Sequence, residues 1–189
     1  MAKLDKGQYG SRNQGRRMRL AVTLVLAAAI LAQLAARMLT DNQAAKNILT
    51  VMAILTVLPM ANMASPLLAS WKYRTLDASL YQKIRPYEAK TRILYDLILT
   101  TKEQVIPADA AAVHPMGVYL YVPVPGLDAA RAEKGLNDLF SANRLDPHVK
   151  LIKDEKSFLR RLESLKPAAE YADDGSVDYA AGLLKNLSM

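Results

Sequence analysis

Two long uncharged stretches dominate the first third of the chain. The first runs from Leu20 to about Leu39 with no charge before Arg37, and the second runs from Ile48 to Trp71 with no charge at all. About 20 apolar residues in an α-helix cross the ~30 Å hydrocarbon core of a bilayer, so each stretch predicts a transmembrane helix. Only the polar segment TDNQAAKN separates them. The pattern therefore predicts a transmembrane helical hairpin within residues 20–71, with helices over about 20–39 and 48–71.

The first stretch has a second interpretation, as a secretory signal peptide that is removed. A signal peptide has a shorter apolar core, followed by two small residues at the cleavage site. Here the core is longer, and Leu34 and Ala36 stand where the two small residues are needed. The sequence favours a retained anchor, and cleavage stays open as the alternative.

After residue 72 the apolar positions gather into shorter segments. They predict a short helix before Pro86, a helix from Pro86 to about Thr101, two hairpin strands in ADAAAVHP and GVYLYVPVP, a helix capped by Asp128, a strand in HVKLI and a helix capped by Asp154. The segment VDYAAGLLKNLSM fits either a short helix or a closing strand. This order predicts a small α/β (α+β) domain over 72–189, with a sheet of three or four strands and with helices. A basic tail over 1–19 would precede the hairpin.

Charge predicts how the hairpin is oriented. The chain carries a net charge of +7, and its basic residues gather on the two outer flanks of the hairpin. Cytoplasmic flanks of membrane proteins are rich in Lys and Arg, so both termini are expected in the cytoplasm and the hairpin in the plasma membrane. The same flanks are expected to contact anionic lipid headgroups. The residues of this basic flank are Arg16, Arg17, Arg19, Lys72 and Arg74.

Small side chains recur every four residues in both apolar stretches. Such stripes allow two helices to pack closely in lipid, where no hydrophobic force drives them together. We therefore expect helix packing through Ala28, Ala32 and Ala36 on the first helix and through Ala61, Ser65 and Ala69 on the second.

The sequence contains few residues that carry chemistry. Cysteine is absent and only His114 and His148 are present, which argues against disulfides, thiolate sites and a histidine-based zinc site. No phosphate-binding loop or nucleophile motif occurs, and no cofactor is expected. The one weak catalytic pattern is Asp154-x-Lys156 after a predicted strand, as in metal-dependent nucleases, with Asp138 or Asp146 as the upstream acid. A helix cap at Asp154 explains the same letters.

A basic patch around Lys150–Lys166 raises the possibility of a nucleic-acid partner. Proteins that bind single strands place aromatic side chains among their basic residues, and only Phe158 lies within this patch. Phe158 also fits the apolar stripe of its helix. A solvated or lipid-facing helix surface is the favoured interpretation, and nucleic acid is disfavoured as a partner.

Several segments together resemble a known family. The opening MAKLDKGQYG, the two-span hairpin, YDLILTTKEQVIP and the ending LLKNLSM resemble a small uncharacterised family of clostridial-type membrane proteins, sometimes labelled "O-linked GlcNAc transferase-like". That label implies tetratricopeptide repeats and a two-lobed nucleotide-sugar domain, and this sequence fits neither. The resemblance carries no functional residues over to this chain.

The sequence favours a two-pass membrane protein whose cytoplasmic domain acts as a non-catalytic protein-binding or scaffold module, with a protein partner yet to be identified. The alternative is a membrane-tethered enzyme, a metal-dependent nuclease or one acting on phosphoesters, with Asp154 and Lys156 in its site. A third hypothesis is a subunit of a larger membrane complex that docks through the small-residue stripes. The oligomeric state does not follow from any of these patterns.

Overall fold

The computed structural model describes residues 4–146, 148–172 and 174–189. The chain forms two compact units. One, the hairpin unit, is Asn13–Tyr73; the other, the globular domain, combines the residues up to Arg12 with Arg74–Met189. The domain thus begins two residues later than the predicted boundary at residue 72, and it also includes a stretch from the predicted N-terminal tail.

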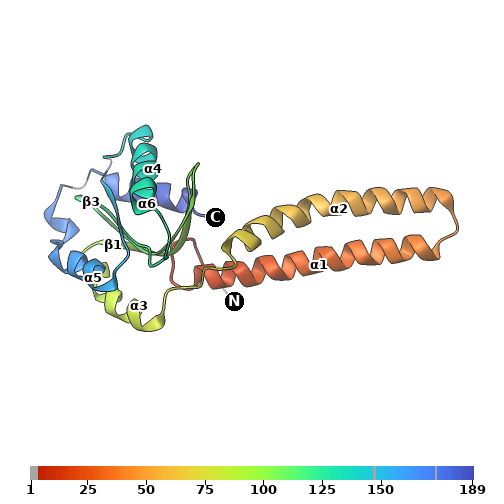
Figure 1. The fold of residues 1–189 in the computed structure, drawn as a ribbon, viewed down its shortest axis with the longest axis horizontal. Coiled ribbons are helices and arrows are strands. Elements are labelled where there is room, and N and C mark those ends of the chain that lie inside the picture. The colour runs from red at the N-terminus through yellow and green to blue at the C-terminus, as the bar shows by residue number, and fades with distance from the viewer. Residues whose placement is uncertain (1–3, 147, 173) are drawn as a thin grey trace. The chain divides into compact units, whose positions relative to one another are not determined.

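The hairpin unit consists of two long helices, α1 (Ser11–Leu39, whose first two residues belong to the domain) and α2 (Gln43–Ser70). Both helices are long and apolar enough to cross a membrane. At 1.5 Å per residue each rises about 42 Å, which is more than the ~30 Å hydrocarbon core needs. Because only residues 40–42 join them, the helices run antiparallel (Figure 1). Asn42 begins α2 by accepting hydrogen bonds from the backbone N–H groups of Ala44 and Ala45.

The helices do not pack through the predicted small-residue stripes. Every residue of those stripes is exposed: Ala28, Ala32, Ala36, Ala61, Ser65 and Ala69. The less exposed positions recur at three- and four-residue spacing instead, at Leu26, Ile30 and Gln33 on α1 and at Leu49, Ala53, Thr56 and Met60 on α2. This spacing suits two nearly antiparallel helices, since it keeps one side of each helix facing the other. A strict four-residue stripe drifts away from such a seam.

The globular domain is built on one four-stranded mixed sheet in the order β1-β2-β3-β4. The strands are β1 (Arg92–Thr100), β2 (Val105–His114), β3 (Gly117–Tyr121) and β4 (Val149–Ile152). The first three are antiparallel neighbours, and β4 is parallel to β3. The predicted hairpin of β2 and β3 and the predicted strand β4 are confirmed. So is a mixed α/β domain with a small sheet.

The helix predicted from Pro86 to about Thr101 is wrong. Residues Arg85–Ala89 form a 3-10 turn and β1 follows. Six consecutive residues of β1, from Leu94 to Leu99, are buried because helices cover both faces of the sheet. A strand buried on both faces is apolar without alternation, and such a run resembles a buried helix in sequence.

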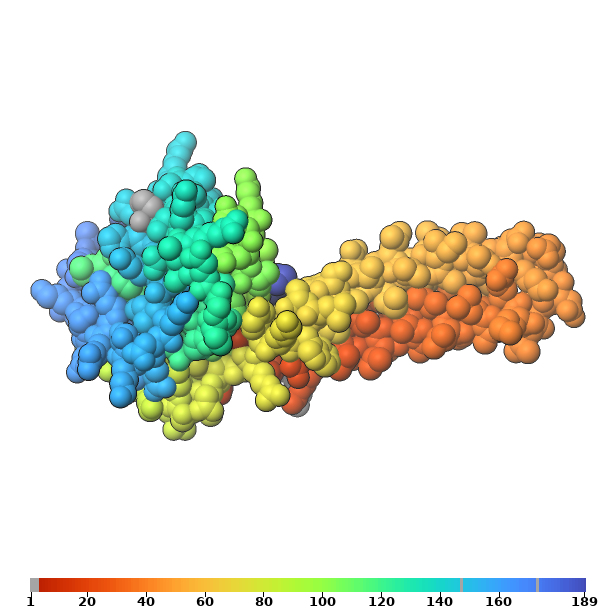
Figure 2. Space-filling view, viewed as in Figure 1, coloured from red at the N-terminus to blue at the C-terminus, as the bar shows by residue number. Residues whose placement is uncertain are grey.

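Helices cover the sheet on both sides. On one face, α4 (Ala129–Ala142) and α6 (Ser176–Leu187) pack over Leu97, Leu120 and their neighbours. On the other, α3 (Ala78–Ile84) and α5 (Glu155–Ser164) pack over Tyr95, Tyr119 and Tyr121, and the short turn Ala168–Glu170 follows α5. The final segment, which the sequence left open, is thus a helix. Asp128 and Asp154 cap α4 and α5 as predicted. Figure 2 shows α4 and α5, teal to blue, at the surface of the domain.

Candidate functional site

The ladder between β1 and β2 is interrupted where Asp96 faces Asp109. The pairs on either side, Tyr95 with Ala110 and Leu97 with Ala108, keep one register. Residues two apart on a strand normally share a face, yet Tyr95 packs on the α3/α5 side and Leu97 on the α4/α6 side. Ala110 and Ala108 switch faces in the same way. Each strand therefore carries one extra residue at this level, and the Asp96 backbone takes a left-handed φ of 58° to accommodate it.

The side chain of Arg12 fills this interruption. Its guanidinium donates to the backbone carbonyls of Leu97 and Ala108, each at 3.0 Å, and to Asp109 Oδ1 at 2.8 Å. A fourth bond goes to the carbonyl of Arg74. The Arg12 side chain is only 4% exposed, so this is a buried cation paired with a carboxylate and with backbone oxygens.

The Asp96 carboxylate accepts hydrogen bonds from the backbone before and after the hairpin unit. Its Oδ2 accepts from the N–H of Gly10 at 2.8 Å, and its Oδ1 accepts from the N–H of Leu76 at 3.1 Å. The segment that leads into the hairpin and the segment that leaves it are thus both fixed to the same residue of β1. We call the set Arg12, Arg74, Asp96 and Asp109 the clamp.

Further contacts fix the segment ahead of Arg12. The carbonyl of Gly7 accepts from the N–H of Tyr95 at 2.8 Å, and the ring of Tyr9 stacks on Tyr81 with centroids 4.0 Å apart. The predicted basic tail over 1–19 is therefore not a separate element, because its described residues up to Arg12 are part of the domain. A short polar segment has no periodicity, so nothing in the sequence signalled this packing.

Burial and charge act in opposite directions on Asp109. Desolvation raises the pKa of this carboxyl group, and the neighbouring Arg12 guanidinium lowers it, with burial the larger effect. Asp109 therefore depends on Arg12 to remain charged inside the domain. The sequence offered one hint of this site: a lone acidic residue interrupts each of two apolar runs, ILYDLIL and IPADAAAV.

Both outer strands of the sheet are covered by side chains or tails. On β4, the amide of Asn137 accepts from Val149 N–H at 2.8 Å and donates to Val149 C=O at 3.3 Å, and Glu133 accepts from Leu151 N–H. On β1, Ser188 Oγ accepts from Ile98 N–H. An uncovered edge would offer a template for a partner's strand, and these contacts occupy it.

Known proteins do not identify this site. The chain matches no family model, no curated protein and no solved structure. The resemblance to the clostridial-type membrane family stays a prediction, and function has to be argued from the residues of this chain.

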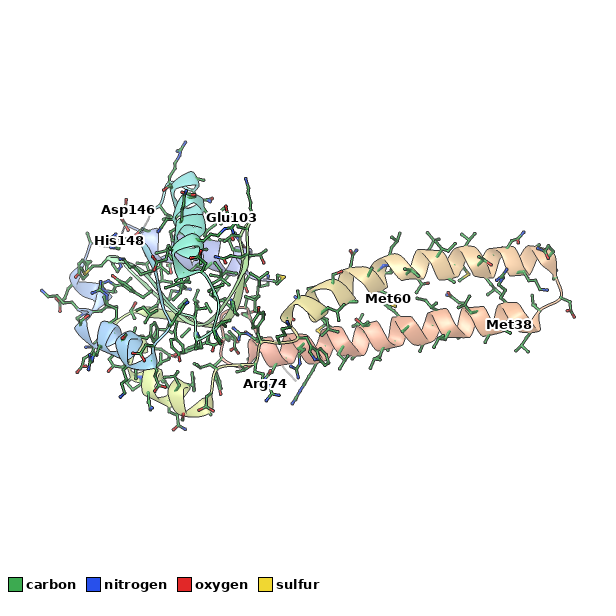
Figure 3. All side chains as sticks on the ribbon, viewed as in Figure 1. Met38, Met60, Arg74, Glu103, Asp146 and His148 are labelled. Atoms are coloured by element: carbon green, nitrogen blue, oxygen red, sulfur yellow. The ribbon has the colours of Figure 1, made fainter. Side chains whose placement is uncertain are left out.

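The predicted catalytic pair does not form a recognisable centre. Asp154 Oδ2 accepts from both the N–H and the hydroxyl of Ser157 at 2.8 Å, and these bonds lower the pKa of Asp154 as expected for a helix cap. Lys156 is exposed on the first turn of α5, and Asp138 is exposed on α4. Asp146 is exposed in the loop after α4 (Figure 3). Among the residues that the structure describes, no three acidic or histidine side chains are grouped so that they could hold a metal ion.

The predicted basic flank is divided between the two units. Arg16, Arg17 and Arg19 lie in the first turns of α1, and the Arg16 guanidinium stands 5.1 Å from the ring centre of Trp71. This contact joins the two ends of the hairpin unit, where a tryptophan and a cation suit a membrane interface. Lys72 is exposed, and Arg74 belongs to the clamp through its carbonyl.

Proposed function

We propose that this chain is a two-pass membrane protein that holds its globular domain at the cytoplasmic face of the plasma membrane, where the domain is a non-catalytic protein-binding or scaffold module. The observation that carries the proposal is the bond from the Arg12 guanidinium to the carbonyl of Arg74. This bond joins the residue just before the hairpin unit to the residue just after it, and both residues belong to the globular domain.

The clamp supports retention of the first apolar helix over its removal as a signal peptide. Cleavage within or after α1 would separate Tyr9, Gly10 and Arg12 from the strands that bind them. It would leave the partly buried Asp109 carboxylate without its cation, which is destabilising. A domain that incorporates the residues ahead of α1 favours a chain that keeps α1.

The basic flank supports a cytoplasmic location for the domain. Arg16, Arg17, Arg19 and Lys72 lie near the two outer ends of the hairpin in the sequence, whereas the turn between its helices has few charges. By the positive-inside rule the end with more Lys and Arg stays in the cytoplasm.

A binding role fits the surface of the domain better than turnover does. Asp154, on which the enzymatic alternative depends, is engaged in capping α5. Because both sheet edges are covered, we expect a partner to contact helix faces and loops rather than to add a strand. The hypothesis of a subunit docking through the membrane helices makes a different prediction, namely contacts along α2.

The absence of cysteine allows a direct test of topology. Single-cysteine variants Asp41→Cys, in the turn between the helices, and Ser141→Cys, on α4, would be treated in intact cells with a membrane-impermeant maleimide. We expect labelling of the first, and labelling of the second only after the membrane is permeabilised. Labelling of both in intact cells, or an intact mass lacking the first helix, would contradict the proposal.

Partners are best sought with the full chain, because the domain includes residues ahead of the hairpin. Photo-crosslinking residues placed at exposed positions of α4 and α5, and separately along α2, would be activated in native membranes. Crosslinks of one protein from the domain would support a binding module. Crosslinks from α2 alone would favour the complex subunit, and none from either set would count against both.

A further inference from the structure

A groove with a basic lining lies on the α5 side of the sheet. It has a volume of about 380 Å³ and is formed by β3, β4 and the loop ahead of β4, and by α5. Its polar lining comes from Tyr119, His148, Lys150, Ser157 and Arg161, and Leu151 and Ile152 of β4 complete it, with the Ile152 side chain on the α5 side of the sheet. His148 lies just before β4 (Figure 3).

The close fit of the backbone at one end of this groove depends on a glycine. Gly117 has a φ of 135°, and a Cβ atom there would lie 2.5 Å from the carbonyl oxygen of His148. That same oxygen accepts from the N–H of Val118 at 2.9 Å. Gly117 thus allows β3 and the loop ahead of β4 to lie close together, which holds His148 at the groove.

Arg161 is held in position. Its guanidinium lies 4.3 Å from the ring centre of Tyr119 and donates to the Tyr119 hydroxyl. Tyr119 is itself 2% exposed, so it forms a fixed support. A guanidinium stacked and bonded in this way keeps its remaining N–H groups in one orientation and loses little entropy when it binds a ligand.

The two charged side chains that line the groove, Lys150 and Arg161, are both cationic. No carboxylate lines it, and within the described part of the chain neither Lys150 nor Arg161 forms an ion pair. The nearest acidic residues on α5 have other partners, Asp154 with Ser157 and Glu155 with Lys83. The bond to neutral Ser157 leaves the Asp154 carboxylate beside the groove, so attraction of an anion depends on the two lining cations together outweighing this one carboxylate.

We propose that this groove binds a phosphate monoester, with Arg161 and Lys150 holding the phosphate and Ile152 of β4 contacting the rest of the molecule. A doubly charged phosphate matches two cations, whereas a carboxylate needs only one. The volume suits a small ligand and is too small for a macromolecule. The same phosphate chemistry occurs in a free metabolite and in a lipid headgroup, and the test separates these two sources.

The test uses full-length protein in nanodiscs of phosphatidylcholine, titrated calorimetrically with inorganic phosphate and with glycerol 3-phosphate. We expect saturable, salt-sensitive binding that Lys150→Gln weakens about tenfold or more. The matched control, Lys134→Gln on the exposed side of α4, is expected to bind like the parent chain. Lys150 is exposed, so its replacement is not expected to disturb folding, and thermal melting checks this.

Phosphatidic acid included in the nanodiscs tells the two sources apart. If it abolishes binding of glycerol 3-phosphate, the groove takes its phosphate from a lipid headgroup. If binding is unchanged, the ligand is soluble; both outcomes keep the groove as a phosphate site. Absence of saturable binding for both probes, or equal binding by the Lys150→Gln variant, would overturn the proposal.

Discussion

Arg12 connects its own segment to several separate parts of the domain. It is a buried cation whose four hydrogen bonds connect the N-terminal segment, both strands of the interrupted ladder and the chain after the hairpin. A buried ion pair adds little compared with an apolar pair, but loss of one partner leaves an uncompensated charge. We therefore expect the loss of stability on removing Arg12 to exceed the stability that the intact ion pair adds.

We predict that Arg12→Met lowers the free energy of unfolding by about 2–4 kcal/mol, because the partly buried Asp109 carboxylate, 19% exposed, loses its partner and two strand carbonyls lose their donor. Denaturant unfolding of the full chain in detergent measures this. Arg17→Met is the matched control, since Arg17 is exposed five positions along the same helix. Equal stability of the two variants would mean that the clamp contributes nothing.

The pH dependence of that loss has a definite sign. Burial raises the pKa of Asp109 above its ordinary value of 3.8, so its contribution to stability is largest below 3.8 and declines as pH rises through the raised pKa. Without Arg12 the pKa rises further. The deficit of Arg12→Met should therefore be larger at about pH 7 than at about pH 5, and adding Asp109→Asn should remove most of this difference. A deficit that grows on acidification would contradict the account.

His114 should make stability depend on pH in the opposite direction. Its Nδ1 accepts from Met116 N–H at 3.1 Å and its Nε2 lies 3.0 Å from the carbonyl of Lys166, a pattern that a neutral ring satisfies. Burial lowers its pKa below 6.5. Its contribution is therefore present above 6.5 and lost as pH falls through the lowered pKa. We expect His114→Gln to flatten the stability curve below 6.5, as measured by thermal unfolding at several pH values, and a curve that keeps its slope would contradict this account.

At the scale of elements, the edge of β4 shows how a helix protects a sheet. The side chain of Asn137 pairs with both backbone groups of Val149 much as a neighbouring strand would. We predict that Asn137→Ala lowers the free energy of unfolding by about 1–2 kcal/mol and increases association between chains on heating, because the strand edge becomes available. Asp138→Ala, at the next and exposed position, is the control. Light scattering with denaturant unfolding measures both effects, and matching curves would rule out edge protection by Asn137.

For the whole molecule, the clamp determines which fragments can fold. A chain starting at Tyr73 lacks Arg12, Gly10 and Tyr9, so we expect it not to fold cooperatively. Replacing residues 13–73 with a short Gly/Ser linker keeps the clamp, since Arg12 bonds directly to the carbonyl of Arg74. We expect that variant to be folded and soluble without detergent. Circular dichroism melting compares the two, and cooperative unfolding of the fragment alone would show the N-terminal segment to be dispensable.

Local signals in the sequence were enough for most elements. The two apolar helices, the β2–β3 hairpin, β4 and the helices capped by Asp128 and Asp154 follow from run length, turn residues and capping residues. Each of these signals acts within a few residues of the chain, so a single sequence contains it in full.

Tertiary structure decided the rest, because those features depend on distant parts of the chain. β1 pairs with β2 and is covered by helices on both faces, and that burial removes the alternation by which a strand is recognised. Each helix of the hairpin unit packs through the side that faces the other helix, and its stripe of small residues lies elsewhere on its surface. The pairing of Arg12 with Asp109 joins positions 97 residues apart. The sequence determined which local elements form, and tertiary packing determined which charges are buried together.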